Sequence, residues 1–218
     1  GINAFGKKNF LGTFSPPHGV INDSALLSSL DDRSAISGYA EALKVALLKD
    51  ATFFDWIGKN AVALQKREPT EVEHLIFRCA QLHLQHISEN GDPFEKGSSR
   101  PLDFGHWSAH KIEQLTDFDC QHGEAVALGI QLDCLYAHAK GWLSHEHLSR
   151  IQITIERLGL PTAHPVFDNF ELVWEGMSEF QEHLGGSLAI PMIKGLGLPF
   201  EIDEVDADLF AKCAEKLN

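Results

Sequence analysis

Three histidines within a short stretch constrain most strongly how this chain can fold. His106 and His110 are four residues apart, so a helix would carry both imidazoles on one face, about one turn apart. His122 follows a break, TDFDCQ, and begins a second apolar run, HGEAVALGIQLDCLYA. A helix, a turn and a second helix would therefore bring His122 back beside His106.

These histidines suggest a metal site. Two imidazoles and one carboxylate are a common ligand set for catalytic zinc, with the fourth position left for water or substrate. A single histidine at a helix start or in a loop is more simply read as a capping or surface residue. For the three histidines together, beside Gly105 and Gly123, the metal site and the polar surface are equally acceptable interpretations.

Composition excludes several classes of function. The formal net charge of -13 argues against nucleic-acid binding, which needs a cationic surface, but a small anionic substrate needs only a few local cations. The four cysteines, Cys79, Cys120, Cys134 and Cys213, form no CxxC pair and are read as reduced thiols of a cytoplasmic protein. No apolar run approaches the ~18 residues of a membrane span, and no signal peptide is visible.

Apolar residues recur at helical spacing from Ser24 onward, which predicts a mainly α fold, a multihelical bundle. Short β segments are expected near both ends: in the Gly- and Pro-rich residues 1–23, and in a hairpin formed by SLAIPMIKGLGLPFEI. Thr70 and Glu73 have the spacing of a capping box and predict that Thr70 caps a helix over residues 71–89. Because the chain opens as a loop and a short strand, residues 1–23 are interpreted as the tail of a preceding domain and 24–218 as a helical domain.

Glu41 has two interpretations. It lies three residues before Lys44, so the two side chains share a helix face and could form an exposed ion pair. Its neighbours Ala40, Ala42 and Leu43 also allow a buried carboxylate that acts as a ligand.

The order of four motifs resembles the C-terminal half of dehydroquinate synthase and related sugar phosphate cyclases. The motifs are GKKN near the start, then GYAEALK, GHWSAHKIE and HGEAVALG, and the resemblance extends from Gly1 to about Gly197. It implies a helical metal-binding domain that follows an NAD-binding α/β domain, most of which would lie outside this chain. It also implies a cytoplasmic enzyme that commonly forms homodimers.

The resemblance implies a role for each matching residue. The metal, zinc or another divalent ion such as Co2+, would be bound by Glu41, His106 and His122. Lys44 would contact the substrate hydroxyls beside the metal, and His110 would lie by the substrate phosphate and relay protons.

Further matches concern the cofactor and the substrate. Lys8 and Asn9 match a motif that serves NAD and phosphate, and Ser29 falls where the family often has a residue near the nicotinamide. Glu95 matches a catalytic glutamate in the loop before the histidines, and Asp103 lies three residues before the first metal histidine.

The implied chemistry is that of a carbon–oxygen lyase acting on a sugar phosphate. NAD+ oxidises a hydroxyl, phosphate is eliminated, the ketone is reduced again, and the opened ring closes to a carbocycle. One alternative is an alcohol or polyol dehydrogenase of the same superfamily, which would share the metal ligands and release NADH. Another is a non-catalytic helical module that kept the metal site for stability.

Several positions depart from dehydroquinate synthase itself. Asp103 replaces an asparagine, Ser99 aligns with an arginine that Arg100 could supply one position later, Gln85 lies near an expected lysine, and His183 replaces a phosphate-side lysine. Fewer cations and an added carboxylate disfavour a substrate carboxylate by like-charge repulsion. The sequence therefore slightly favours a neutral-headed seven-carbon sugar phosphate, such as sedoheptulose 7-phosphate, over the acidic substrate of dehydroquinate synthase. The alternative is an ordinary dehydroquinate synthase in which Arg100 reaches the carboxylate.

Overall fold

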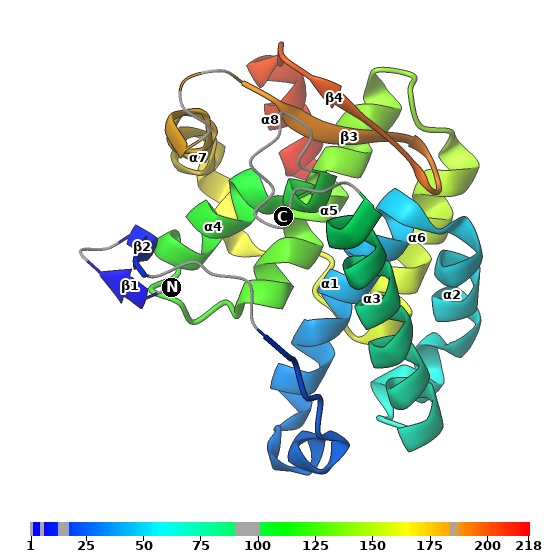
Figure 1. The fold of residues 1–218 in the computed structure, drawn as a ribbon. Coiled ribbons are helices and arrows are strands. Elements are labelled where there is room, and N and C mark those ends of the chain that lie inside the picture. The colour runs from blue at the N-terminus through cyan, green and yellow to red at the C-terminus, as the bar shows by residue number, and fades with distance from the viewer. Residues whose placement is uncertain (1, 5–6, 13–17, 90–100, 184–185, 187) are drawn as a thin grey trace.

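The computed structural model describes residues 2–4, 7–12, 18–89, 101–183, 186 and 188–218 (Figure 1). The longer helices are α1 (Asp32–Lys49), α2 (Ala51–Gln65), α3 (Pro69–Glu89), α4 (His106–Leu115), α5 (His122–Ala139), α6 (His145–Leu158), α7 (Phe170–His183) and α8 (Ala207–Ala214). Short 3-10 turns are η1 (Ser24–Ser29), η2 (Pro101–Asp103), η3 (Pro165–Asn169) and η4 (Glu215–Leu217).

Two antiparallel hairpins lie near the ends of the chain. The first pairs β1 (Ile2–Ala4) with β2 (Lys7–Leu11), and the second pairs β3 (Ile190–Gly195) with β4 (Leu198–Ile202). The prediction of a mainly α fold with short β segments near both ends is therefore confirmed. None of the described helices is both long enough and apolar enough to cross a bilayer.

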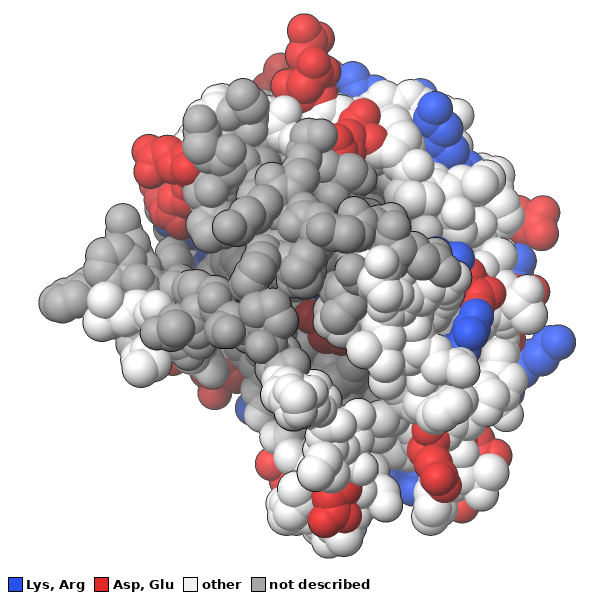
Figure 2. Space-filling model, viewed as in Figure 1, with Lys and Arg blue, Asp and Glu red and all other residues white. Residues whose placement is uncertain are grey.

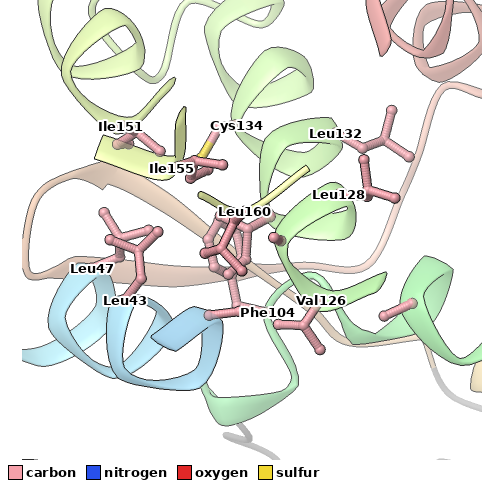
Figure 3. Packing of buried hydrophobic residues seen from close by; sticks show 14 of the residues in the cluster. Leu43, Leu47, Phe104, Val126, Leu128, Leu132, Cys134, Ile151, Ile155 and Leu160 are labelled. Atoms are coloured by element: carbon pink, nitrogen blue, oxygen red, sulfur yellow. The ribbon is translucent and has the colours of Figure 1, made fainter. Parts of the chain in front are cut away.

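Helix α5 is the centre of the bundle. Every residue from Ala125 to Ala137 is buried, as expected for a helix that is apolar on nearly all sides. Helices α1, α4, α6 and α8 and strand β3 all pack against it. Figure 3 shows Cys134 of α5 beside Ile155 of α6, in the same hydrophobic cluster as Val126 of α5 and Leu43 of α1. The start of α5 is thus fixed by one continuous core.

Two glycines of α5 allow very close backbone contacts. A Cβ atom on Gly123 would lie 1.8 Å from the carbonyl oxygen of Ser37 on α1, and one on Gly129 would lie 2.0 Å from that of Gly105, just before α4. No other residue fits at either position without a shift of the backbone. These contacts set the spacing of α1, α4 and α5.

Local signals explain most helix starts. Asp31, Asp50 and Ser144 each accept a hydrogen bond from a backbone N–H in the first turn of α1, α2 and α6, respectively. The predicted cap at Thr70 is wrong, because α3 already includes both Pro69 and Thr70. Proline is favoured at a first helical position, where its missing N–H has no intrahelical partner to lose.

Candidate metal centre

Three side chains from three helices meet at one point. Glu41 lies in the middle of α1, whereas His106 and His122 are the first residues of α4 and α5. Glu41 Oε1 lies 3.1 Å from His122 Nε2 and 3.5 Å from His106 Nε2, and one donor atom from each residue lies within 4.8 Å of the others. The structure therefore brings together the two imidazoles and the carboxylate.

The His106 ring is held from its far side. Its Nδ1 lies 3.1 Å from the carbonyl oxygen of Phe104, which can only accept, so Nδ1 donates and Nε2 is the ring nitrogen that could coordinate a metal. The two neighbours of His106 are both tied to Asp133 of α5, Gly105 through its backbone and Trp107 through its indole ring. The Asp133 carboxylate accepts from Gly105 N at 2.8 Å and from Trp107 Nε1 at 2.9 Å.

The Asp133 carboxylate lies in the core, where a charged group is unfavourable. It is fully buried, and this burial raises its pKa to about 7, although the hydrogen bonds from Trp107 and Gly105 act in the opposite direction. Sequence reasoning missed this residue. The signal was one acidic residue within the apolar run LGIQLDCLYA, which predicts a hydrogen-bonded partner in the core.

The His122 ring lies between two carboxylates. Its Nε2 faces Glu41, and its Nδ1 lies 2.9 Å from Glu113 Oε2. Glu113 was also missed, although it shares a helix face with His106 and His110, seven and three residues before it. Around the start of α5, Arg33 binds Glu124 through Nε at 2.6 Å, and Glu124 in turn accepts from Gln121 N at 2.8 Å.

Lys44 lies inside the cluster. Its buried Nζ lies 2.6 Å from Glu41 Oε2 and 3.5 Å from His106 Nε2, so both interpretations of Glu41 hold in part: it pairs with Lys44 and also faces the histidines. Burial raises the pKa of Glu41, but hydrogen bonds from His106 and His122 and the charge of Lys44 outweigh it and hold that pKa well below its usual range. Glu41 is therefore an ionised carboxylate, the form that can act as a metal ligand.

His110 lies one helical turn after His106, beside both histidine ligand candidates. Its ring centroid is 5.4 Å from that of His106 and 5.9 Å from that of His122, with the latter pair stacked. The imidazole thus borders the cluster, where it could contact a bound molecule.

The other predicted site residues are less closely defined. Glu95 and Arg100 lie outside the described residues, as do the side chains of Lys8 and Asn9 in β2 and of His183 at the end of α7. Asp103 is half-buried in η2, which packs against α1. Ser29 is exposed in η1, where its hydroxyl donates to Leu26 O at 2.7 Å. Their roles stay predictions.

No cysteine belongs to either group of convergent donor atoms among the described residues. Burial, followed by the negative charge of Glu41, raises the pKa of Cys79 to about 12, and burial likewise raises that of Cys120 to about 12.

Comparison with known proteins identifies the family. Residues 38–181 match the sequence profile described as 3-dehydroquinate synthase C-terminal. The chain belongs to the 3-dehydroquinate synthase family. Among curated members of that family, the 3-dehydroquinate synthase of Dichelobacter nodosus is 31% identical over 216 residues, which are 98% of this chain and 58% of the relative. The chloroplastic 3-dehydroquinate synthase of Solanum lycopersicum is 32% identical over 89% of this chain and 44% of its own length.

Solved structures of related cyclases share the fold. ValA, the 2-epi-5-epi-valiolone synthase of Streptomyces hygroscopicus subsp. jinggangensis, solved with NAD+ and Zn2+ bound, superposes with a TM-score of 0.90 at 29% identity and covers 100% of this chain and 60% of ValA. A 2-deoxy-scyllo-inosose synthase superposes with a TM-score of 0.81 at 20% identity and covers 100% of this chain and 61% of that protein, which shows likeness of fold. The chain spans less than two thirds of the length of these relatives.

Proposed function

We propose that this chain is the metal- and substrate-binding part of a sugar phosphate cyclase of the 3-dehydroquinate synthase family. The observation that carries this proposal is the convergence of Glu41, His106 and His122 around the buried ammonium group of Lys44. The NAD+ and Zn2+ bound to ValA support the same cofactors here.

The donor set fits a divalent metal such as Zn2+ or Co2+. Both imidazoles can present Nε2, and the carboxylate is ionised, which matches catalytic zinc sites with an open fourth position. A bound metal would polarise the substrate hydroxyl and lower its pKa, which favours oxidation by NAD+.

The neighbouring residues would bind and orient the sugar phosphate. Lys44 is close enough to Glu41 and His106 to donate a hydrogen bond to a substrate hydroxyl beside the metal. His110, on the same face of α4, would contact the phosphate and carry protons to and from it. The overall reaction would be oxidation, phosphate elimination, reduction and ring closure to a carbocycle.

We propose a substrate with a neutral head, of the sedoheptulose 7-phosphate type. Asp103 adds a carboxylate in η2, next to the helix that carries Glu41 and Lys44, and so disfavours an acidic head by charge repulsion. A turnover assay of the full-length protein with both substrate types tests this. Preference for the acidic substrate would contradict it and would favour Arg100 as the carboxylate partner.

We also propose that residues 1–23 link this domain to an NAD-binding domain, which agrees with the greater length of the curated relatives. The isolated 218 residues are then expected to show no turnover, and full turnover by this chain alone would refute the proposal. The four free cysteines suit the reducing cytoplasm. Sedimentation of the full-length protein would test the homodimer that the family resemblance implies.

Metal content is the direct test of the site. We expect about one zinc per chain by elemental analysis, as in a three-ligand catalytic site, and loss of that zinc in His106→Ala and His122→Ala. His145→Ala is the matched control, because His145 is exposed in the first turn of α6, away from the cluster. Retention of zinc in both ligand variants would refute the proposed site.

A further inference from the structure

We infer that Glu113 is a positioning residue for the metal centre: it holds the His122 ring so that Nε2 points at the metal and makes that nitrogen a stronger donor. This inference deepens the proposed function and rests on the metal site proposed above. It assigns a task to a buried acidic side chain that lies outside the ligand set and is one helical turn away from His110.

The two ring nitrogens of His122 contact two different carboxylates, those of Glu41 and Glu113. Its two nitrogens point in different directions, with Nε2 3.1 Å from Glu41 Oε1 and Nδ1 2.9 Å from Glu113 Oε2. A metal bound at Nε2 alongside Glu41 and His106 therefore leaves Nδ1–H to donate to Glu113. Metal-bound histidines commonly make such a hydrogen bond to a carboxylate, which fixes the tautomer and raises the basicity of the ligand.

Burial of Glu113 favours its hydrogen bond with His122. The Glu113 side chain is 8% exposed, whereas the His122 side chain is 37% exposed. A buried carboxylate needs a hydrogen-bond donor, and the His122 Nδ1–H meets this need at a charge-assisted distance. Glu113 therefore holds the Nδ1 side of the His122 ring.

The placement of Glu113 on α4 couples the two histidine ligands. His106 begins α4, and Glu113 follows two turns later on the same face, so one rigid helix provides a ligand and also orients the ligand of α5.

A competing use of the same residues is a second ion. Donor atoms of His110, Glu113 and His122 also lie within 4.8 Å of one another. In that case the imidazole of His122 would bridge two metals, and Glu113 would be a ligand. Metal stoichiometry separates the two arrangements, since our inference requires one ion per chain.

The experiment compares wild type with Glu113→Ala and Glu113→Gln in the full 218-residue chain. Zn2+ affinity is measured by competition with a chelator, and the visible absorption of the Co2+-loaded chain reports the ligand geometry. Glu124→Gln is the matched control, because it removes one negative charge at the start of α5 but keeps an acceptor for the capping hydrogen bond and does not face the His122 ring. Circular dichroism confirms that each variant is folded.

We expect Glu113→Ala to lower Zn2+ affinity by about 10- to 100-fold and to change the Co2+ spectrum, with one ion bound in each case. Glu113→Gln should recover part of the affinity, because its amide oxygen can still accept from Nδ1–H. Glu124→Gln should match wild type in affinity and spectrum.

Unchanged affinity and spectrum in Glu113→Ala, with wild type binding one zinc, would overturn the inference and leave the proposed site intact. Two ions in wild type, falling to one in Glu113→Ala, would also overturn it in favour of the second metal. Failure of wild type to bind any metal would overturn both the proposed function and the inference. If Glu113→Ala does not fold, the Glu113→Gln spectrum decides: identity with wild type in both affinity and spectrum contradicts a role for the carboxylate charge.

Discussion

The junction of α1, α4 and α5 differs sharply from the face formed by η1 and α3. At the junction, backbones touch at Gly123 and Gly129, and polar groups such as Asp133 are buried and hydrogen bonded. Between η1 and α3 lies an open groove of about 680 Å³, in which Ile21 is 94% exposed and Phe77 61% exposed. Figure 2 shows a largely uncharged surface over α3, bordered by acidic and basic side chains.

This difference distinguishes the region that fixes the positions of the ligand candidates from a region where substitutions should be tolerated. The histidine ligand candidates begin helices that pack tightly into the core, so packing fixes their positions. The residues of the η1–α3 face make fewer such contacts. Substitutions at the two regions should therefore differ in their effect on both stability and metal binding.

The largest contrast is expected between two phenylalanines. Phe104 is fully buried just before α4, and Phe77 is mostly exposed on α3. Phe104→Ala should lower the free energy of unfolding by about 3–5 kcal/mol, because it leaves a cavity beside the carbonyl that holds His106. Phe77→Ala should change it by less than about 0.5 kcal/mol. Urea unfolding of both variants measures the contrast, and similar losses would show that the η1–α3 face is as tightly packed as the junction.

Glycines sharpen the same comparison. Gly129→Ala should destabilise the chain by about 3 kcal/mol, because its Cβ would collide with the backbone at Gly105. Gly38→Ala is the control: a Cβ at Gly38, on the exposed side of α1, meets no atom within 4 Å. It should stabilise by about 0.5–1 kcal/mol through helix propensity. A mild effect of Gly129→Ala in the same unfolding assay would mean that α4 and α5 can move apart easily.

Metal binding should stabilise the junction specifically. Free Zn2+ at 100 times its dissociation constant should raise the free energy of unfolding by about 2.7 kcal/mol, and removal by a chelator should reverse the gain. The gain should vanish in His106→Ala and persist in Phe77→Ala. Denaturation with and without Zn2+ measures it, and an equal gain in wild type and His106→Ala would point to non-specific binding.

The buried Asp133 should make the stability of the junction depend on pH. Its folded pKa of about 7 lies above the ordinary value of 3.8, so between these values the folded chain keeps a proton that the unfolded chain has released. Its contribution to stability therefore falls as pH rises and levels off above pH about 7. Relative to Asp133→Asn, wild type should lose about 1.4 kcal/mol between pH 5 and pH 6. A constant difference between the two proteins over this range would contradict the raised pKa.

The sequence predicted the helical bundle because apolar spacing is a local property. It also predicted that His106 and His122 would meet, since a helix, a turn and a second helix leave few other arrangements. The placement of Glu41 beside them followed from the family resemblance, and the metal it would bind stays a proposal. The break between α1 and α2 depends on the capping residue Asp50, and α3 begins at Pro69. The spacing of apolar residues reveals neither boundary.

Long-range hydrogen bonds account for what was missed. Glu113 lies on the face of α4 that carries His106 and His110, but nothing in its local sequence shows that it accepts from a ring nine residues later. Asp133 interrupts an apolar run, and its partners Gly105 and Trp107 lie 28 and 26 residues earlier. Such pairs are decided by how the helices pack, so they become visible only in three dimensions.

The glycines beside the ligands have a consequence for protein engineering. His106 follows Gly105 and His122 precedes Gly123, so each imidazole is attached to a backbone that touches a neighbouring helix. A designer who transplants only the two histidines and the glutamate into another bundle would place them on helices kept apart by ordinary side chains. The unit to transplant is therefore the dipeptides Gly105–His106 and His122–Gly123 together with the backbone surfaces that they contact. A scaffold has to be chosen for its helix spacing before the ligand residues are introduced.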